Sequence, residues 1–223
     1  MRGLTPLSRS RCSLSSMSGS GSIFIISAPS GSGKSTLVSG LLKQIPNLDF
    51  SVSYTTRPPR GSEKDGVEYF FVSEATFEEM IAKDEFVEHA QVFGHYYGTS
   101  KVRLEQTLAS GMDVVLDIDT EGAAQVKAKY PEAIGIFVMP PSYAMLKERL
   151  EKRSLDSADT IRKRLWWASQ TEIERYQRYD YVLINEDLAS SSDLMRSIIL
   201  AERCKTRRML GRVESIIKTF GGH

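Results

Sequence analysis

A chain of 223 residues, 41% hydrophobic and 26% charged, is long enough to bury a sizeable core, as one domain or as a core with inserted subdomains. The net charge of +1 gives no reason to expect nucleic acid or an anionic membrane as the main partner. Cys12 and Cys204 lie far apart, which argues against a disulfide framework or a metal site and fits a reducing, cytoplasmic compartment. No apolar run approaches the ~18 residues of a membrane span.

Residues 1–21 form a stretch of distinct composition. They are rich in serine, carry three arginines and no acid, and end in Ser18-Gly19-Ser20-Gly21. This composition predicts a disordered N-terminal extension. A transit peptide has the same arginine-rich, acid-poor character, and Met17 is an alternative start of the chain. We expect the extension to be inert.

A β-branched run at residues 23–27 leads into a loop of small residues and then into an amphipathic segment. The loop reads Ala28-Pro29-Ser30-Gly31-Ser32-Gly33-Lys34-Ser35-Thr36. It predicts a phosphate-binding loop for ATP, because small residues let backbone N–H groups turn inward at a helix N-terminus. Lys34 is expected to reach the β- and γ-phosphates, and Ser35 to offer its hydroxyl to Mg²⁺. Ala28 replaces the first glycine of the usual G-x-x-x-x-G-K-[ST] pattern, which leaves the loop plausible; a flexible Gly/Ser turn is the alternative.

The first helix is predicted at residues 36–44, after which the character of the chain changes. Residues 50–99 hold four of the nine tyrosines and several short β-rich runs. We interpret them as an inserted substrate-binding subdomain. Within it, Ser73 is expected to cap a short helix that ends at Lys83 and turns Phe77 toward a small core.

Hydroxyl and guanidinium groups are concentrated at residues 51–60. Arg57 and Arg60 lie on either side of Pro58-Pro59, and serine, threonine and tyrosine hydroxyls precede them. Guanidinium forks bind phosphate through two hydrogen bonds, and hydroxyls satisfy the remaining oxygens. The loop therefore predicts an oxyanion site, with a basic surface turn as the alternative.

After residue 110 strands and helices alternate again. Strands are predicted at residues 114–118, 134–139 and 181–185, and helices at residues 122–129, 143–153, 158–178 and 192–208. This order is typical of an α/β fold, in which a central parallel sheet lies between two layers of helices.

An acid is expected at the end of a strand near the phosphate loop, on the Mg²⁺ side. The run Val114-Val115-Leu116-Asp117 supplies one, and Asp119 lies on the same side because side chains alternate along a strand. Asp117 is therefore a predicted metal ligand together with Ser35. A pair of solvated acids after a strand is the alternative.

Several motifs, in order along the chain, resemble those of guanylate kinases, the nucleoside monophosphate kinases of the P-loop class. The run from Ser53 to Tyr69, Ser-x-Thr-Thr-Arg-x-x-Arg-Gly-x-x-x-x-Gly-x-x-Tyr, resembles their nucleoside-monophosphate site. The likeness extends to Phe86-Val87-Glu88-His89-Ala90, Tyr96-Tyr97-Gly98-Thr99-Ser100, Leu116-Asp117-Ile118-Asp119-x-x-Gly122-Ala123, Arg149-Leu-x-x-Arg153, Lys163-Arg164 and Asn185. It covers residues 22–208, and Ala28 resembles the loop of many bacterial members.

The resemblance implies a GMP site. The residues that would hold the GMP phosphate are Ser53, Arg57, Arg60, Tyr69 and Tyr97. Glu88 and Thr99 would read the base, and Asp119 would take the outer N2 hydrogen. A carboxylate accepts two hydrogen bonds side by side, which matches the adjacent N1–H and N2–H₂ donors of guanine, whereas adenine has no donor at N1. Taken singly, these residues have plainer interpretations: Glu88 as a solvated edge-strand acid, the two tyrosines as subdomain core, and Thr99 as a helix cap.

The resemblance also implies a mobile helical lid. Arg149, Arg153 and Arg164 match its arginines by position and would neutralise charge on the transferring phosphoryl group. A solvated, salt-bridged helix pair is the alternative. Within this region the adjacent Trp166 and Trp167 cannot both face the core, so one of them is expected to be exposed.

Together the motifs predict an ATP-dependent guanylate kinase that converts ATP and GMP to ADP and GDP in purine nucleotide metabolism, with Mg²⁺ as cofactor and Lys34 among the catalytic residues. No dedicated base is needed, because the GMP phosphate is largely a dianion at neutral pH. Asn185 is a candidate contact for adenine. The expected organisation is a core at residues 22–49 and 110–208, a GMP-binding subdomain at 50–99, a lid at about 149–165 and a C-terminal tail at 209–223.

Two other functions stay open. One is a related P-loop kinase acting on a ribose bisphosphate or a different nucleoside monophosphate. The other is a scaffold domain that resembles guanylate kinases and binds peptides, although the intact Gly33-Lys34-Ser35 argues against it. Homo-oligomerisation is left open, and neither a nucleic-acid partner nor a membrane is expected.

Overall fold

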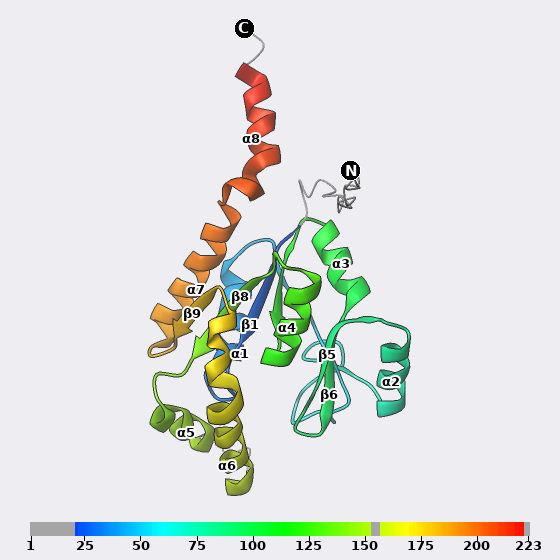
Figure 1. The fold of residues 1–223 in the computed structure, drawn as a ribbon, viewed down its shortest axis with the longest axis vertical. Coiled ribbons are helices and arrows are strands. Elements are labelled where there is room, and N and C mark those ends of the chain that lie inside the picture. Colours follow the sequence, from blue (N-terminus) through cyan, green and yellow to red (C-terminus); the bar gives the residue numbers. More distant parts are fainter. Residues whose placement is uncertain (1–20, 153–156, 221–223) are drawn as a thin grey trace, which may run out of the picture.

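The computed structural model of the chain describes residues 21–152 and 157–220 (Figure 1). The predicted extension at residues 1–20 and the predicted lid residue Arg153 lie outside these ranges. Gly21, which we expected in the disordered extension, belongs to the fold: it is buried, and its N–H donates to the Leu108 carbonyl oxygen at 2.9 Å. A Cβ at this position would lie 1.7 Å from the Met112 carbonyl oxygen, so a side chain has no room there.

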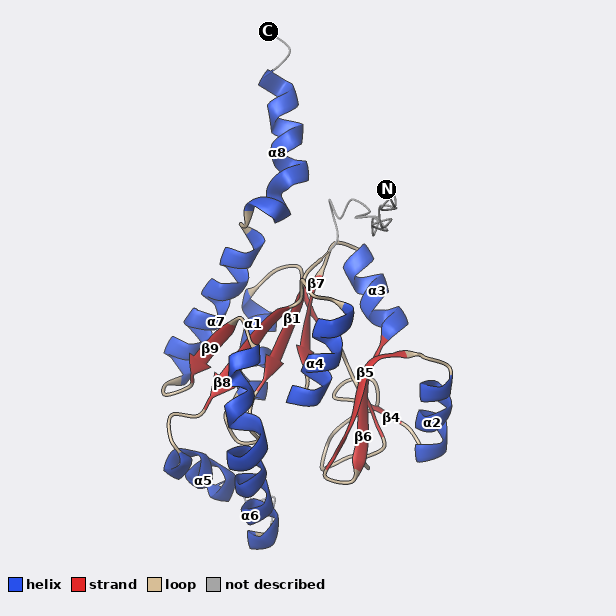
Figure 2. Ribbon diagram, viewed as in Figure 1, coloured by secondary structure: helices blue, strands red, loops and turns tan. Residues whose placement is uncertain are grey.

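Parallel strands form the central sheet, as predicted (Figure 2). Their spatial order is β2 (Leu48–Phe50), β7 (Asp113–Asp117), β1 (Ile23–Ser27), β8 (Ile134–Met139) and β9 (Tyr181–Ile184). The three central strands are apolar runs buried along almost their whole length, which is the pattern of a sheet covered on both faces. The sequence did not predict β2, because three residues are too few to show a period of two.

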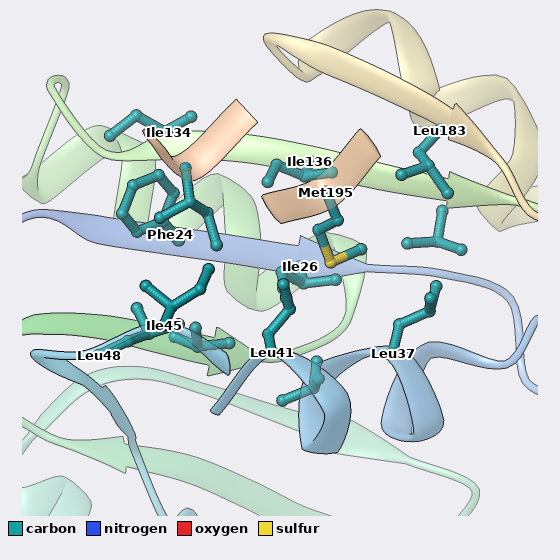
Figure 3. Packing of buried hydrophobic residues seen from close by; sticks show 14 of the residues in the cluster. Phe24, Ile26, Leu37, Leu41, Ile45, Leu48, Ile134, Ile136, Leu183 and Met195 are labelled. Carbon is teal, nitrogen blue, oxygen red and sulfur yellow. The ribbon is translucent and has the colours of Figure 1, made fainter. Parts of the chain in front are cut away.

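Helices cover both faces of this sheet. On one face lie α1 (Lys34–Gln44) and α7 (Leu188–Arg203), and on the other α3 (Lys101–Ala109) and α4 (Thr120–Lys129). Figure 3 shows the first face, where Phe24 and Ile26 of β1 belong to one cluster with Leu41 of α1 and Met195 of α7. Burial stabilises each such side chain by about 1.5–3 kcal/mol. The two elements that flank the phosphate loop, β1 and α1, are therefore firmly packed.

A second, smaller sheet contains the residues predicted to form an inserted subdomain (Figure 2). Its strand order is β4 (Phe70–Phe71), β3 (Tyr54–Thr55), β6 (His95–Ser100) and β5 (Phe86–Val92). The predicted helix is α2 (Glu74–Ala82), and its predicted cap, Ser73, accepts a hydrogen bond from the Thr76 N–H. Phe77 is fully buried and stacks on Phe86, with 4.5 Å between ring centroids. Aromatic packing therefore holds α2 on the smaller sheet.

One side chain ties the two sheets together. Gln125 of α4 accepts a hydrogen bond from the His89 N–H of β5 at 3.1 Å and donates one to the His89 carbonyl oxygen at 2.8 Å. The amide thus pairs with β5 as a neighbouring strand would. This pairing fixes the smaller sheet relative to α4 and the core.

The predicted lid comprises α5 (Tyr143–Lys152) and α6 (Ala158–Trp167), which share an apolar cluster that includes Leu150 and Leu165. The prediction of one helix over residues 158–178 is wrong beyond Trp167. A π-helical turn (Ala168–Glu172) and a 3₁₀-helix (Ile173–Arg178) follow instead. Apolar periodicity reports that a segment is helical but does not distinguish i→i+4 from i→i+5 hydrogen bonding, so this change was not visible in the sequence.

The predicted helix over residues 192–208 is also two helices. α7 ends at Arg203, and α8 (Thr206–Phe220) takes up most of the predicted tail. Arg203 fixes the end of α7, because its Nε donates to the Asp113 carboxylate at 2.7 Å and its Nη2 to the Pro46 carbonyl oxygen at 2.9 Å. Beyond this anchor α8 projects away from the central sheet (Figure 1). None of the helices in the described part of the chain has the length and apolar character of a membrane span.

Candidate active site

The loop between β1 and α1 has the geometry of a phosphate cradle. The Ser32 N–H donates to the Pro29 carbonyl oxygen at 3.0 Å, which closes a turn, and Gly31 and Gly33 have φ of 95° and 89°. At Gly33 a Cβ would also lie 2.5 Å from the Asn185 amide nitrogen. Glycine is thus required for both conformation and space, and the backbone N–H groups at the start of α1 can face an anion.

Lys34 and Asp117 lie together at one end of the central sheet. β1 and β7 are neighbours with Ile26 beside Asp117, so the residue that opens α1 comes close to the acid that ends β7. The Lys34 ammonium forms an ion pair with Asp117, and its Nζ lies 3.4 Å from the Ile118 carbonyl oxygen. Ser35 is exposed in the first turn of α1. The lysine predicted to bind phosphate and the acid predicted to bind metal are therefore paired with each other.

Two of the three predicted lid arginines reach the phosphate loop. Arg149 of α5 lies 3.4 Å from the Ser32 carbonyl oxygen and donates to the Asn185 carbonyl oxygen at 2.9 Å. Arg164 of α6 lies 3.3 Å from the Ser30 hydroxyl. The alternative of a purely solvated helix pair is therefore wrong for these two side chains, whose guanidinium groups extend toward the loop.

Asn185, the candidate for adenine, lies behind the phosphate loop. Its side-chain amide is 3% exposed and donates to the Ser32 carbonyl oxygen at 2.6 Å. This contact holds the loop between β9 and α1. Contact with adenine stays a prediction for this residue.

A buried arginine lies at the predicted oxyanion site. Arg57 is 5% exposed and donates to Glu63 Oε1 at 2.9 Å and to the Pro58 carbonyl oxygen at 2.8 Å. Burial opposes its charge, but the hydrogen bond and negative charge of Glu63 outweigh burial and raise the pKa of Arg57. The same hydrogen bond lowers the pKa of Glu63. Sequence reasoning missed Glu63, because no local pattern identifies the partner of a buried arginine.

Of the other predicted phosphate ligands, the two tyrosines lie near Arg57, whereas the Arg60 side chain is exposed. The Tyr69 ring centroid is 5.2 Å from the Arg57 guanidinium carbon and 5.9 Å from the Tyr97 ring centroid. Ser53 lies beside them, since its carbonyl oxygen accepts a hydrogen bond from Phe70. The Arg60 side chain is exposed at the rim, and its backbone N–H donates to Glu63 at 2.7 Å.

The predicted base-reading pair lies inside the smaller sheet. Glu88 and Thr99 are opposite each other on β5 and β6, and the Thr99 hydroxyl donates to Glu88 Oε1 at 2.6 Å. Glu88 is 3% exposed, so the alternative of a solvated edge acid is wrong. Burial raises the pKa of Glu88 to about 7, although the Thr99 hydrogen bond opposes this shift. Hydrogen-bond donors on a ligand would stabilise the charged form of this buried carboxyl.

The first turn of α4 closes over this carboxyl. Asp119 is the N-cap of α4 and accepts a hydrogen bond from the Gly122 N–H at 2.7 Å. A Cβ at Gly122 would lie 2.4 Å from Glu88 Oε2. Asp119 therefore has a capping role that the sequence did not predict. Thr99 is not a helix cap, because Ser100 fills that position.

Glu172 is a partly buried acid that sequence reasoning missed. It closes the π-helical turn after α6, and burial raises its pKa to about 7, while the positive charge of Lys34 opposes the shift. Three residues later, Arg175 contacts α4, where it donates to the Thr120 hydroxyl at 2.9 Å. A regular helix would have placed Glu172 differently, so helical periodicity offered no signal.

The predicted ATP and GMP residues interact electrostatically across the two sheets. Burial raises the pKa of Tyr69 to about 12, and the negative charge of Asp117 adds to the shift. Tyr69 belongs to the smaller sheet and Asp117 to the central one, so the charged end of β7 lies within electrostatic reach of the predicted GMP-phosphate residues. The end of the central sheet that carries the phosphate loop is thus electrostatically coupled to the cationic and hydroxyl groups of the smaller sheet.

Comparison with known proteins places this arrangement in a family. A family model described as guanylate kinase matches residues 20–202. A guanylate kinase of Koribacter versatilis is 53% identical over 225 residues, which cover 90% of this chain and 96% of that protein, and one of Nitrosomonas europaea is 48% identical over 198 residues, 89% and 98%. The crystal structure of guanylate kinase from Anaplasma phagocytophilum superposes with a TM-score of 0.73 at 35% identity, covering 92% of this chain and 98% of that one. The chain belongs to the guanylate kinase family.

Proposed function

We propose that this protein transfers the γ-phosphoryl group of ATP to GMP and produces ADP and GDP. The observation that carries the proposal is the buried Glu88–Thr99 pair, in a chain that also contains a phosphate loop. Guanine presents N1–H and N2–H₂ side by side and can satisfy both lone-pair directions of a carboxylate, whereas adenine would leave Glu88 partly unpaired. An unpaired buried group of this kind costs about 1–3 kcal/mol or more.

The acceptor phosphate is assigned to the residues around Arg57. Its guanidinium is held by Glu63 and lies over the Tyr69 ring, so little side-chain entropy is lost when a phosphate binds. Ser53, Tyr69 and Tyr97 offer hydroxyls, and Arg60 approaches from the rim. These residues orient a phosphate oxygen of GMP toward the phosphate loop.

The donor triphosphate is assigned to residues 28–36. Lys34 moves from Asp117 to the β- and γ-phosphate oxygens, and this exchange frees the Asp117 carboxylate. Ser35 and Asp117 are hard oxygen donors at the loop, which suits Mg²⁺, a metal that takes few protein ligands and completes its shell with phosphate and water. The described residues contain no cluster of three metal-binding side chains that could hold the ion without the nucleotide. Bound Mg²⁺ supplies neutralisation of the triphosphate charge.

Positioning and charge neutralisation account for the transfer step. The GMP phosphate is largely a dianion at neutral pH and attacks without a base. Arg149 and Arg164, and Arg153 by resemblance, lower the energy of the charge that spreads over the equatorial oxygens. We infer that α5 and α6 act as a lid and that the smaller sheet is the GMP-binding subdomain.

A nucleotide-specificity assay on the full chain tests the proposal. With saturating ATP and Mg²⁺, kcat/KM for GMP should exceed that for AMP, UMP and a ribose bisphosphate by at least about 10²-fold, because only guanine pairs the buried carboxyl. Equal rates for GMP and any of these acceptors would refute the proposal and favour a related kinase.

A further inference from the structure

The turn between β5 and β6 contains an unusual residue for its backbone. Phe93 and Gly94 connect the two strands and have φ of 50° and 85°. Two-residue turns with positive φ at both positions favour asparagine, aspartate or glycine at the first, because a bulky side chain is strained there. Phe93 is also 54% exposed, so burial does not offset the strain. A ring kept at such a position points to a role outside the hairpin.

The Phe93 ring reaches across to α6. Its centroid lies 6.4 Å from that of Trp167 with the planes tilted by 60°, and 5.8 Å from the guanidinium carbon of Arg164. Both separations fall within the range of attractive aromatic and cation–π contacts. A cavity of about 400 Å³ lies at this junction, lined by Phe93, Arg162, Lys163, Trp166 and Trp167. The contact joins the smaller sheet directly to α6.

Both tryptophans are exposed, Trp166 by 62% and Trp167 by 40%, so the expectation that they cannot both face the core is confirmed. Trp167 is the less exposed of the two and is the one in contact with Phe93. The Trp167 side chain is therefore on the side of α6 that faces the hairpin.

Arg164 links the Phe93 ring to the phosphate loop. Its Nη1 lies 3.3 Å from the Ser30 hydroxyl of the phosphate loop, while its guanidinium carbon lies over the Phe93 ring. The ring limits the positions that the guanidinium can occupy, because the attraction to an aromatic face falls off with distance and angle.

We propose that Phe93 is a positioning residue that aims Arg164 at the phosphate loop and couples the smaller sheet to α6. The proposal rests on the proposed function, since Arg164 must act on the transferring phosphoryl group for its aim to matter. Phe93 acts through Arg164.

The variant Phe93→Asn separates this role from folding, because asparagine suits a left-handed turn residue. The Tm should not fall, whereas kcat should drop at least about threefold, the rate equivalent of a cation–π contact. KM for GMP and ATP should change by less than about twofold. Phe93→Tyr keeps the ring and should restore kcat. Val102→Asn changes another exposed apolar residue, in α3, and should leave turnover unchanged.

Coupling to Arg164 is measured by a double-mutant cycle. Phe93→Asn should lower kcat much less in an Arg164→Ala background than in the wild type, because its target is already absent. Full additivity of the two losses, or wild-type kcat in Phe93→Asn, would overturn the proposal.

Tryptophan fluorescence reads the contact without any turnover, since Trp166 and Trp167 are the chain's two tryptophans. Emission of Phe93→Asn without substrates should differ from that of the wild type, and Val102→Asn should match the wild type. An unchanged spectrum in Phe93→Asn would refute the contact. Failure of the wild-type protein to phosphorylate GMP would refute the proposed function instead.

Discussion

At the scale of single residues, we propose that the donor half of the site depends on Lys34. The lysine is paired with Asp117 and lies near the Ile118 carbonyl oxygen, so its ammonium is already held at the mouth of the phosphate loop. Triphosphate oxygens carry more charge than one carboxylate and can replace it. The pair therefore positions the lysine before nucleotide binds.

Replacement of this lysine should remove activity and keep the fold. In Lys34→Ala we expect kcat to fall by at least about 10³-fold, because no other cation reaches the β- and γ-phosphates from α1. The Tm should shift by only a few degrees, since the pair is partly exposed and contributes little to stability. Lys43→Ala, on an exposed site of the same helix, is the control. Wild-type turnover in Lys34→Ala would show that the loop is not the ATP site.

The sequence predicted the roles of those residues whose function is determined by their immediate neighbours in the chain. Gly33 and Lys34 follow from the spacing of the loop, and Ser73 from the start of a helix. Glu63 and Glu172 could not be predicted in this way. Their surroundings are created by Arg57 and by a π-helical turn, and neither the partner nor the turn leaves a local pattern.

At the scale of elements, α4 connects the two halves of the site. It begins at Asp119 beside the end of β7, packs its first turn on Glu88, and pairs with β5 through Gln125. α4 therefore holds the smaller sheet relative to the end of the central sheet that carries the phosphate loop.

The Gln125 contact should matter for both stability and GMP binding. In Gln125→Ala the His89 N–H and carbonyl oxygen lose their partner in a part-buried position, which should lower the free energy of unfolding by about 1–3 kcal/mol. KM for GMP should rise more than KM for ATP, because β5 carries Glu88. Denaturant unfolding and steady-state kinetics measure the two effects, with exposed Gln106→Ala as control. Equal stability and equal KM for GMP would contradict this role of α4.

Most elements could be predicted from the sequence, and the errors have identifiable causes. The strand at Ile134–Met139 was predicted at its observed bounds, because a buried parallel strand is a continuous apolar run. The helix over residues 158–178 was wrong where its hydrogen-bond pattern changes. The division between α7 and α8 depends on Arg203, whose partner Asp113 is distant in sequence.

At the scale of the whole molecule, two acids with raised pKa values, the buried Glu88 and the partly buried Glu172, make stability depend on pH. The pKa values of Glu88 and Glu172 are each raised to about 7, chiefly by burial. Both lie above the value of about 4.5 expected in the unfolded chain. Between these values the folded state binds more protons than the unfolded state, so its stability decreases as pH rises. The contribution is fully present below about pH 4.5 and is lost as pH passes about 7.

Substrate-free protein should accordingly lose a few kcal/mol of unfolding free energy between pH 5 and pH 8 through these two groups. Glu88→Gln should reduce this pH dependence, because glutamine does not titrate. Urea unfolding across the pH range measures the slope for both proteins. A wild-type slope of zero or opposite sign over this range, or an unchanged slope in Glu88→Gln, would contradict the assignment of a raised pKa to this buried carboxyl.

Fold class and family were predictable from the whole chain, because strand and helix alternation and ordered motifs reinforce one another; both predictions are confirmed. The contact between Phe93 and Trp167 was not predictable. It joins a hairpin turn to a helix more than seventy residues later, and it exists only because the fold brings this turn close to α6.

The most direct test of GMP recognition is the ratio of kcat/KM for GMP to that for AMP in wild type and in Glu88→Gln. A glutamine offers one acceptor oxygen and places an NH₂ group against the guanine donors. The ratio should fall by at least about tenfold, while KM for ATP stays near its wild-type value. An unchanged ratio in Glu88→Gln would show that this carboxyl does not read the base.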